Sequence, residues 1–395
     1  MKKNLAIIIT KLEGGGAERM ASNLSQILVQ DYNVFLIVFD TTNLVYPYKG
    51  KLMDVNIHPS NHVFMKVVNF LRRVKKIRKM KKDYQIDFSI SLLDGPNLVN
   101  ILSRQKDKVI ISVRNRMSYF VKNKLLRLFF GYIYNKADTV VSLSKMVELD
   151  LEEHFSINKN RMQTIYNNCE IEQIKRLANE SVEDEYKDLF ENHDVIISVG
   201  RLEHQKGQWH LIRAFKEVKK DNPKAKLLIF GKGSLESYLK NLAVELNIEN
   251  DVIFAGYVSN TFKYVKRAKM FAFSSLVEGL GNVLLEAMAC GVPVISTDCV
   301  AGPREIIAPN TNILNTSTKM ELEEYGVLVP VCDGNHYSGN DSLTDEERLL
   351  AEAITTVLAN DRLQIKYKEA SLQRVKDFSS DEIRESWKKA IEINE

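Results

Sequence analysis

Two glutamates are of interest because of the segment that joins them. Glu278 precedes a glycine-rich turn, and Glu286 follows eight positions later inside an expected helix. One carboxylate could bind the hydroxyls of a sugar and the other those of a ribose, while the N-terminus of the helix attracts a diphosphate. Such pairs also arise by chance, but here strand, turn, helix and second strand follow in the order that this chemistry requires. The segment therefore predicts a sugar-nucleotide site.

The entry of the expected helix supplies further groups to this site. Gly281, Asn282 and Val283 stand at its beginning, and Gly291 ends it. Asn282 lies four residues before Glu286 and therefore on the same helical face. We assign these first three residues to the nucleotide-sugar site together with both glutamates.

Two cations, Arg201 and Lys206, belong to the run VGRLEHQKG, which follows an earlier expected strand. A forked guanidinium and an ammonium in one loop can neutralise a diphosphate leaving group. Negative charge develops on that leaving group during sugar transfer, so both cations would stabilise the transition state more than the ground state. The flanking glycines favour this role over that of two solvated surface cations. We expect both residues to be catalytic, together with Glu278.

Glycine-rich loops at other strand ends complete the expected nucleotide site. In the second half of the chain these loops contribute Gly231, Lys232 and Tyr257. In the first half, Gly15 and Gly16 follow the first strand and open a helix whose N–H groups can approach a phosphate. A dinucleotide fingerprint is the alternative for this loop, but Arg19 occupies the place of its third glycine.

Runs typical of strands and helices alternate along the whole chain. The expected strands are 5–10, 33–39, 87–93, 108–113 and 139–144, then 195–199, 226–230, 252–255, 270–274, 292–296 and 326–329. Several lack polar alternation, as parallel strands covered on both faces do. This order predicts an α/β fold with two doubly wound Rossmann-like sheets. Their carboxyl edges, where ligands bind, would face a shared central cleft.

A chain of 395 residues is longer than a domain with a single hydrophobic core usually is, so the length predicts two domains. The acidic segment 181–193 is the expected linker. We therefore place a first domain at 1–182 and a second at 183–378, with a final amphipathic helix, 379–395, that returns to the first. The N-terminal apolar run is short and leads into a glycine loop, which favours a buried strand over a signal peptide.

Charge is distributed unevenly along the chain. Residues 1–180 hold 29 Lys and Arg against 17 Asp and Glu, whereas the rest hold 26 against 34. The basic half is expected to face an anionic partner. The four cysteines lack metal or redox spacing, which is typical of a reduced cytosolic protein. His58 and His62 lie four apart without a third ligand nearby, so we expect no metal.

The segment 66–82 is the most basic part of the chain, with nine cations and no acid. Apolar residues recur in it at helical spacing: Val67, Phe70, Leu71, Val74, Ile77 and Met80. A basic amphipathic helix is typical of elements that lie on an anionic membrane surface. We assign that contact to Arg72, Lys75, Lys76, Arg78 and Lys79. The segment 119–130 adds apolar and cationic residues that could enter a leaflet.

Two alternatives for the basic helix remain. Nucleic acid is disfavoured because no aromatic stacking platform or binding motif accompanies the cations. An ordinary domain helix with a solvated cationic face would show the same sequence.

Taken together, the motifs resemble the retaining glycosyltransferases of family 4, which have the two-domain GT-B fold. The resemblance covers nearly the whole chain and rests on runs at 15–18, 200–207, 230–233 and 278–286. It implies that Glu286 binds the ribose, that Glu278 faces the donor sugar, and that Arg201 and Lys206 hold the pyrophosphate. The Gly15–Gly16 backbone would approach the same group. The resemblance also implies metal-independent catalysis without a cofactor, in which the leaving phosphate serves as the base.

A second run narrows the resemblance. DCVAGPREI at 298–306 resembles a variant found in members that build capsule, O-antigen or lipid-linked oligosaccharides. Many members carry a histidine in an acceptor-side loop of the first domain, where this chain has Arg114 in the run VRNR. We expect Arg114 to take over that catalytic role.

The expected function is therefore transfer of a hexose or N-acetylhexosamine from a UDP-sugar to a polyprenyl-pyrophosphate-linked glycan. The enzyme would be cytoplasmic and peripheral on the inner face of the plasma membrane, without nucleic acid as a partner. The alternatives are a non-catalytic partner subunit, a sugar-nucleotide epimerase and a phosphorylase of the same fold. Retention of the predicted site residues disfavours the partner subunit, and a missing cofactor-lysine motif disfavours the phosphorylase.

Overall fold

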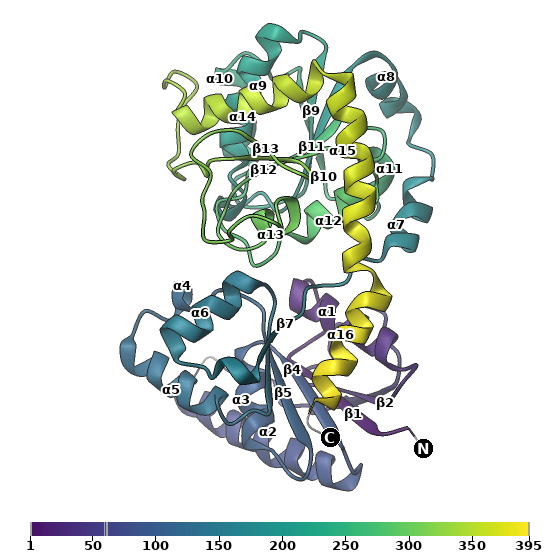
Figure 1. Cartoon of the computed structure of the whole chain (residues 1–395), viewed down its shortest axis with the longest axis vertical. Helices are drawn as coiled ribbons and strands as arrows, with labels where there is room; N and C mark the ends of the chain where they lie inside the picture. Colours follow the sequence, from purple (N-terminus) through teal and green to yellow (C-terminus); the bar gives the residue numbers. More distant parts are fainter. Residues whose placement is uncertain (1, 59, 61, 394–395) are drawn as a thin grey trace. The chain divides into compact units, whose positions relative to one another are not determined.

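The computed structural model describes residues 2–58, 60 and 62–393 and divides them into two compact units. The first runs to Asn168 and also contains the chain from Ser380 onward. The second comprises Cys169–Ser379. Each unit is built on a seven-stranded sheet (Figure 1).

The sheet of the first unit is entirely parallel, with the order β3-β2-β1-β4-β5-β6-β7. Its strands are β1 (Asn4–Ile9), β2 (Asn33–Val38), β3 (Lys51–Asp54), β4 (Phe88–Leu92), β5 (Lys108–Val113), β6 (Thr139–Ser142) and β7 (Met162–Thr164). Strand order reverses at β1, which pairs with both β2 and β4. Ligands of such sheets bind beyond the carboxyl ends of the strands at this reversal.

Helices cover both faces of this sheet. They are α1 (Gly16–Leu28), α2 (Val63–Asp83), α3 (Asp94–Leu102), α4 (Met117–Phe120), α5 (Lys124–Tyr134), α6 (Lys145–Phe155) and α16 (Ser380–Glu392), with the short helix η1 (Lys159–Arg161). Alternate residues of β1 enter different cores: Leu5 and Ile7 face the cluster that includes Trp387, whereas Ala6 and Ile8 face the cluster that includes Ile77. Trp387 is fully buried, so α16 belongs to the core of the first unit.

The sheet of the second unit has the order β10-β9-β8-β11-β12-β14-β13, with only β13 antiparallel. Its strands are β8 (Asp194–Val199), β9 (Ala225–Phe230), β10 (Val252–Gly256), β11 (Met270–Phe273), β12 (Val294–Thr297), β13 (Glu321–Leu322) and β14 (Val327–Val329). The helices are α7 (Ile171–Ala178), α8 (Asp184–Asn192), α9 (Gln208–Asp221), α10 (Glu236–Glu245), α11 (Phe262–Val265), α12 (Asn282–Ala289), α13 (Pro303–Ile307), α14 (Asp345–Leu358) and α15 (Asp361–Arg374), with η2 (His204–Lys206) and η3 (Val375–Phe378).

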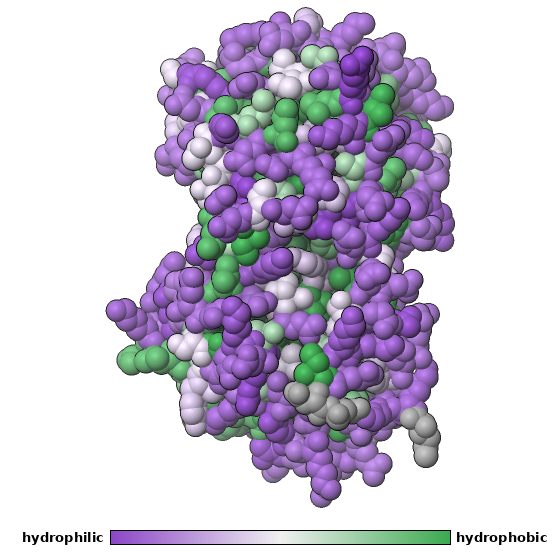
Figure 2. Space-filling model, viewed as in Figure 1, coloured by the Kyte–Doolittle hydropathy of each residue, from purple (hydrophilic) through white to green (hydrophobic). Residues whose placement is uncertain are grey.

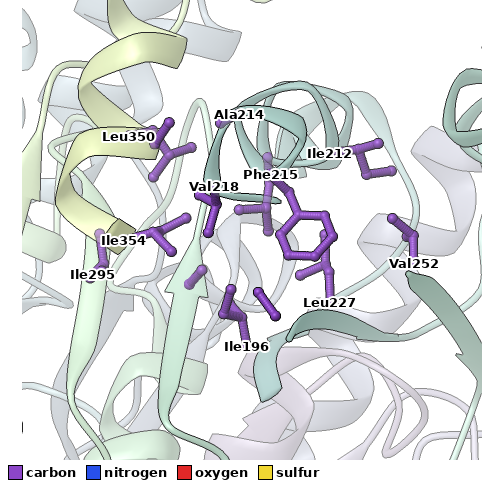
Figure 3. Packing of buried hydrophobic residues seen from close by; sticks show 14 of the residues in the cluster. Ile196, Ile212, Ala214, Phe215, Val218, Leu227, Val252, Ile295, Leu350 and Ile354 are labelled. Carbon is purple, nitrogen blue, oxygen red and sulfur yellow. The ribbon is translucent and has the colours of Figure 1, made fainter. Parts of the chain in front are cut away.

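The core of this unit lies between the sheet and the helices α9 and α14. Figure 3 shows Phe215 of α9 among strand residues that include Ile196 and Leu227, with Leu350 and Ile354 arriving from α14. All five side chains are fully buried. Burial of one such side chain stabilises a fold by about 1.5–3 kcal/mol, so this packing fixes the strand ends that carry the site loops.

The predicted α/β fold with two doubly wound sheets is confirmed, and every expected strand is present. Three strands were missed: β3, β7 and β13. Each is only two to four residues long and forms the outer strand of its sheet, so its sequence carries little periodic signal.

The domain boundary lies earlier than the predicted 182–183. The division falls between Asn168 and Cys169, because α7 packs against α11 and α12 of the second unit. The predicted linker 181–193 is largely the helix α8, which precedes β8 directly. The acidic residues of this segment therefore lie mostly in a helix and not in a flexible linker.

Candidate functional site

The predicted nucleotide-binding loops of the second unit meet at the carboxyl edge of its sheet. The loop after β8 and the loop after β9 are joined by backbone hydrogen bonds: Gly200 N donates to Phe230 O at 3.0 Å, and Leu202 N donates to Lys232 O at 3.0 Å. Gly231 N donates in turn to Gly256 O at 2.8 Å. The loops after β8, β9 and β10 therefore form one continuous rim.

Gly231 is required by this arrangement. Its φ is +141°, and a Cβ atom there would lie 1.8 Å from the carbonyl oxygen of Gly200. Only glycine permits so close an approach of two backbones in this conformation. The predicted residue thus acts by letting two loops touch.

Lys206 and Glu278 lie side by side, although they follow different strands. Lys206 Nζ is 2.5 Å from Glu278 Oε1, and the two side chains are 16% and 10% exposed. The ammonium also lies 5.4 Å from the centre of the Phe273 ring. The sequence assigned Lys206 to the diphosphate leaving group and Glu278 to the donor sugar. In the structure these two side chains form an ion pair. A diphosphate near Lys206 would therefore compete with Glu278 for the same ammonium.

Backbone contacts hold this pair in place. Leu276 N donates to Gln205 O at 2.9 Å, and the side-chain amide of Gln205 donates to Val277 O at 2.7 Å. Gly207, at φ +58°, allows the close approach, since a Cβ atom there would lie 2.4 Å from Ser274 O. The second glycine of the VGRLEHQKG run is thereby explained.

Arg201 lies at the same edge, with an exposed side chain, and its backbone oxygen accepts a hydrogen bond from Gln208 Nε2 at 3.0 Å. Gly281, at φ +87°, caps the N-terminus of α12. Asn282, Val283 and Glu286 are half-buried on that helix. Burial, reinforced by the charge of Glu286, raises the pKa of Cys290 to about 12, so this thiol is neutral.

Tyr257 and Lys232 follow other strands than Lys206 and Glu278 do. Tyr257 is 74% exposed and follows β10, the outer strand, which is separated from β8 by β9. Lys232 is exposed after β9. A nucleotide role for these two residues stays a prediction.

The DCVAGPREI run has an internal structural role. Arg304 Nη2 lies 2.5 Å from Asp298 Oδ2 and 2.9 Å from Glu321 Oε2. Ser317 N also donates to Asp298 Oδ2, at 2.7 Å. These contacts tie the loop after β12 to β13, and Arg304 is only 5% exposed.

In the first unit, α1 begins after Gly15 as predicted. Within the described chain no side chain caps this helix, and the carboxylate of Glu18 lies beside Gly15. The buried face of α1 includes Met20, Leu24, Ile27 and Leu28.

Arg114 follows β5 and is 8% exposed. Its Nη1 donates to Ser112 Oγ at 3.2 Å, and its Nη2 donates to Asn167 Oδ1. Burial lowers the pKa of Arg114 to about 9, which still leaves the guanidinium charged near neutral pH.

Asp94 is a polar residue of this edge that sequence reasoning missed. It follows β4, and its Oδ1 accepts a hydrogen bond from Tyr134 Oη at 2.9 Å. Burial raises the pKa of Asp94. The preceding Leu93 has a φ of +76°, a conformation that is strained for a non-glycine residue. Strained residues of this kind are frequent at ligand sites. The sequence signal that could have identified Asp94 is an acidic residue directly before Gly-Pro at the end of a strand.

The cations predicted to contact a membrane differ in their surroundings. Arg72, Lys75 and Lys79 are exposed on α2. Lys76 Nζ donates to Val55 O at 2.7 Å, and Arg78 donates to Leu102 O, so these two also hold the fold together.

The apolar face of α2 is only partly used by the core. Ile77 is buried, but Val67 and Leu71 are exposed, as are Val63 and Phe64 before them. α5 exposes a second apolar set: Leu125, Leu126, Leu128, Phe129 and Tyr132. Figure 2 shows hydrophobic surface in the region of α5.

Two kinds of feature are absent from the described part of the chain. None of its helices is long and apolar enough to cross a membrane. It also holds no group of three or more His, Cys, Asp or Glu side chains arranged to bind a metal ion.

Comparisons with known proteins agree with this geometry. Residues 180–325 match the model of the family "Glycosyl transferases group 1". An uncharacterised glycosyltransferase of Methanocaldococcus jannaschii is 35% identical over 338 residues, which cover 82% of this chain and 83% of the relative.

A Campylobacter jejuni relative is named for its reaction. This N-acetylgalactosamine-N,N'-diacetylbacillosaminyl-diphospho-undecaprenol 4-alpha-N-acetylgalactosaminyltransferase is 30% identical, with 95% of this chain and 96% of the relative covered.

Solved structures share the fold. A glycosyltransferase of Rickettsia africae aligns over 100% of both chains, with a TM-score of 0.77 and 18% identity. Anabaena HepE, solved in complex with UDP, aligns over 98% of this chain and 99% of HepE, with a TM-score of 0.76 and 17% identity.

Proposed function

Since this chain belongs to the group 1 glycosyl transferases, we propose that it transfers a hexose or N-acetylhexosamine from a UDP-sugar to a polyprenyl-pyrophosphate-linked glycan. Transfer proceeds with retention of the anomeric configuration. The product is a precursor of a bacterial surface polysaccharide.

The observation that carries this proposal is the Lys206–Glu278 pair at the carboxyl edge of the second sheet. Arg201 arises from the same loop as Lys206, so two cations are available for the diphosphate of the donor. When Lys206 turns to the leaving phosphate, the Glu278 carboxylate is released to the sugar hydroxyls. Charge that develops on the phosphate is then met by the cations at the moment of transfer.

The ribose is assigned to Glu286, which lies one helical turn beyond Asn282 on α12. The donor nucleotide is proposed to be UDP, and a neighbour of the same fold was solved with UDP. The acceptor class is proposed from the Campylobacter relative, whose named substrate is a diphospho-undecaprenol glycan. No metal or organic cofactor is needed in this scheme, so chelation with EDTA should leave the rate unchanged.

A lipid-linked acceptor requires access to a membrane surface, and we assign that contact to α5 and the first turns of α2. Exposed leucines and aromatic rings gather there. Residues 108–137 contain no Asp or Glu, while Lys122 and Lys124 lie beside the apolar residues. Apolar side chains flanked by cations bind anionic leaflets peripherally. We therefore propose that the enzyme acts on the inner face of the plasma membrane.

The test is a transfer assay with purified protein. Radiolabelled UDP-hexoses and UDP-N-acetylhexosamines are incubated with undecaprenyl-pyrophosphate glycans in detergent, and label in the organic phase is counted. We expect transfer with one donor class and an α-linked product. Hydrolysis or epimerisation of the donor without a lipid-linked product would contradict the proposal.

A further inference from the structure

Five cationic side chains of the described residues are at least nine-tenths buried: Lys81, Arg114, Arg213, Arg304 and Arg374. Four of them have a carboxylate partner. The pairs are Lys81 with Asp107 at 2.8 Å, Arg213 with Glu347 at 2.8 Å, Arg304 with Asp298 at 2.5 Å, and Arg374 with Asp377 at 2.6 Å. Arg114 is the exception within the described chain.

The partners of Arg114 are neutral. Ser112 Oγ and Asn167 Oδ1 accept from its two terminal nitrogens, while Nε has no hydrogen-bond partner among the described residues. Burial of a charge is unfavourable unless a charge of opposite sign and hydrogen bonds compensate it. The fold supplies this compensation to the other four buried cations of the described residues but not to Arg114. A buried polar group left unsatisfied in this way requires an explanation.

The position of Arg114 provides one. It follows β5, and its partner Asn167 follows β7, so both lie at the carboxyl edge of the first sheet. Parallel sheets bind ligands at this edge. Guanidinium groups bind carboxylates and phosphates through two parallel hydrogen bonds, for which the Nε–Nη side of the fork is suited.

We propose that Arg114 binds an anionic oxygen group of a substrate, either a carboxylate on a sugar or a phosphate of the lipid-linked acceptor. The identity of the substrate rests on the proposed function, whereas the anion-binding role does not. In the carboxylate case the enzyme handles a hexuronic acid; in the phosphate case Arg114 positions the pyrophosphate linker of the acceptor. Asn167 and Ser112 hold the guanidinium in place for either ligand.

The first part of the test needs no substrate. Arg114→Gln removes an uncompensated charge, so its melting temperature should equal or exceed that of the natural protein. Arg304→Gln, the matched control, removes a cation that has a carboxylate partner and should lower the melting temperature by roughly 2–4 °C or more. A loss of stability in Arg114→Gln as large as in the control would indicate a purely structural role and overturn the proposal.

The second part measures binding by calorimetry to the natural protein and to Arg114→Gln. The probes are UDP-glucuronate and UDP-galacturonate beside their uncharged hexose counterparts, and inorganic pyrophosphate at saturating UDP. We expect the natural protein to bind one charged class at least tenfold more tightly than the variant does. Loss of the hexuronate preference identifies a sugar carboxylate, and loss of pyrophosphate binding identifies a phosphate.

Equal affinities of the two proteins for every charged probe overturn the proposal. If UDP binds neither protein, the proposed function fails instead. Pyrophosphate without UDP still reports on Arg114 in that case, so the two failures remain distinguishable.

Discussion

Single residues of the donor site act through their neighbours. Lys206 meets Glu278 because Gly207 and Gln205 fit against the backbone of residues 274–277. The types of these residues could be predicted from sequence, since a cation and a carboxylate at strand ends are visible in one dimension. Their pairing could not, because it depends on two loops that are 72 positions apart. The isolation of Arg114 likewise depends on the surroundings of its side chain and not on its own motif.

Lys206→Ala should lower kcat for sugar transfer by ~10²-fold, the usual loss when one donor to a developing negative charge is removed. Lys224→Ala, at an exposed position of the same unit, is the matched control and should leave kcat unchanged. Steady-state kinetics on both variants test this. Equal kcat values for the two variants would show that Lys206 is not a catalytic residue.

Among the helices of the first unit, the apolar surface of α5 was expected only as part of the longer segment 119–130, and the apolar stripe of α2 was expected to lie on a membrane surface. Long helices with apolar residues at helical spacing are predictable, but the core takes only part of the α2 stripe. Val67 and Leu71 carry the same pattern as buried residues, and only packing distinguishes them. Short outer strands such as β3 were not predicted for a related reason. They form because they pair with a neighbouring strand, and their composition alone does not indicate this.

Leu125→Ser with Leu128→Ser should weaken binding to vesicles of anionic phospholipid by at least tenfold, because these side chains are 75% and 68% exposed and each would enter the leaflet. Ile365→Ser, an exposed apolar residue of the second unit, should leave binding unchanged. Vesicle sedimentation measures both. Undiminished binding of the double variant at moderate salt would discredit α5 as the membrane contact.

The loop between β14 and α14 carries a pH-dependent contact. His336 stacks on Tyr238, with its ring centre 4.7 Å from that of Trp209. Burial and the neighbouring His204 and His210 lower the pKa of His336 below its usual 6.5. The unfolded chain therefore binds more protons than the folded one in the window between that lowered pKa and 6.5. The part of the stability that depends on a neutral His336 is fully present above pH 6.5. It is lost as the pH falls through this window.

His336→Gln removes the titrating group and should make the melting temperature less sensitive to pH. We expect the natural protein to lose more of its melting temperature than this variant between pH 7.5 and pH 5.5. Calorimetry at a series of pH values gives the comparison. Identical pH profiles would show that His336 does not contribute.

At the scale of the whole molecule, two sheets of similar design carry different chemistry. The fold could be predicted because strands and helices alternate without interruption, and this order admits few topologies. The boundary between the units could not, because α7 belongs to the second unit by packing and not by composition. The excess of cations in the first half fits a unit that meets anionic partners, whereas the second half is acidic overall and has two cations, Arg201 and Lys206, in one loop at the donor site.

We propose that the second unit binds a UDP-sugar through Glu286, Arg201 and Lys206. The most direct measurement is the thermal stabilisation of the purified protein by UDP, GDP, ADP and UDP-sugars without added metal. At a hundred times its dissociation constant a ligand adds about 2.7 kcal/mol, which raises the melting temperature by several degrees. We expect this shift for UDP and one class of UDP-sugar, and its loss in Glu286→Ala. A protein that melts cooperatively yet responds to none of these nucleotides would contradict it.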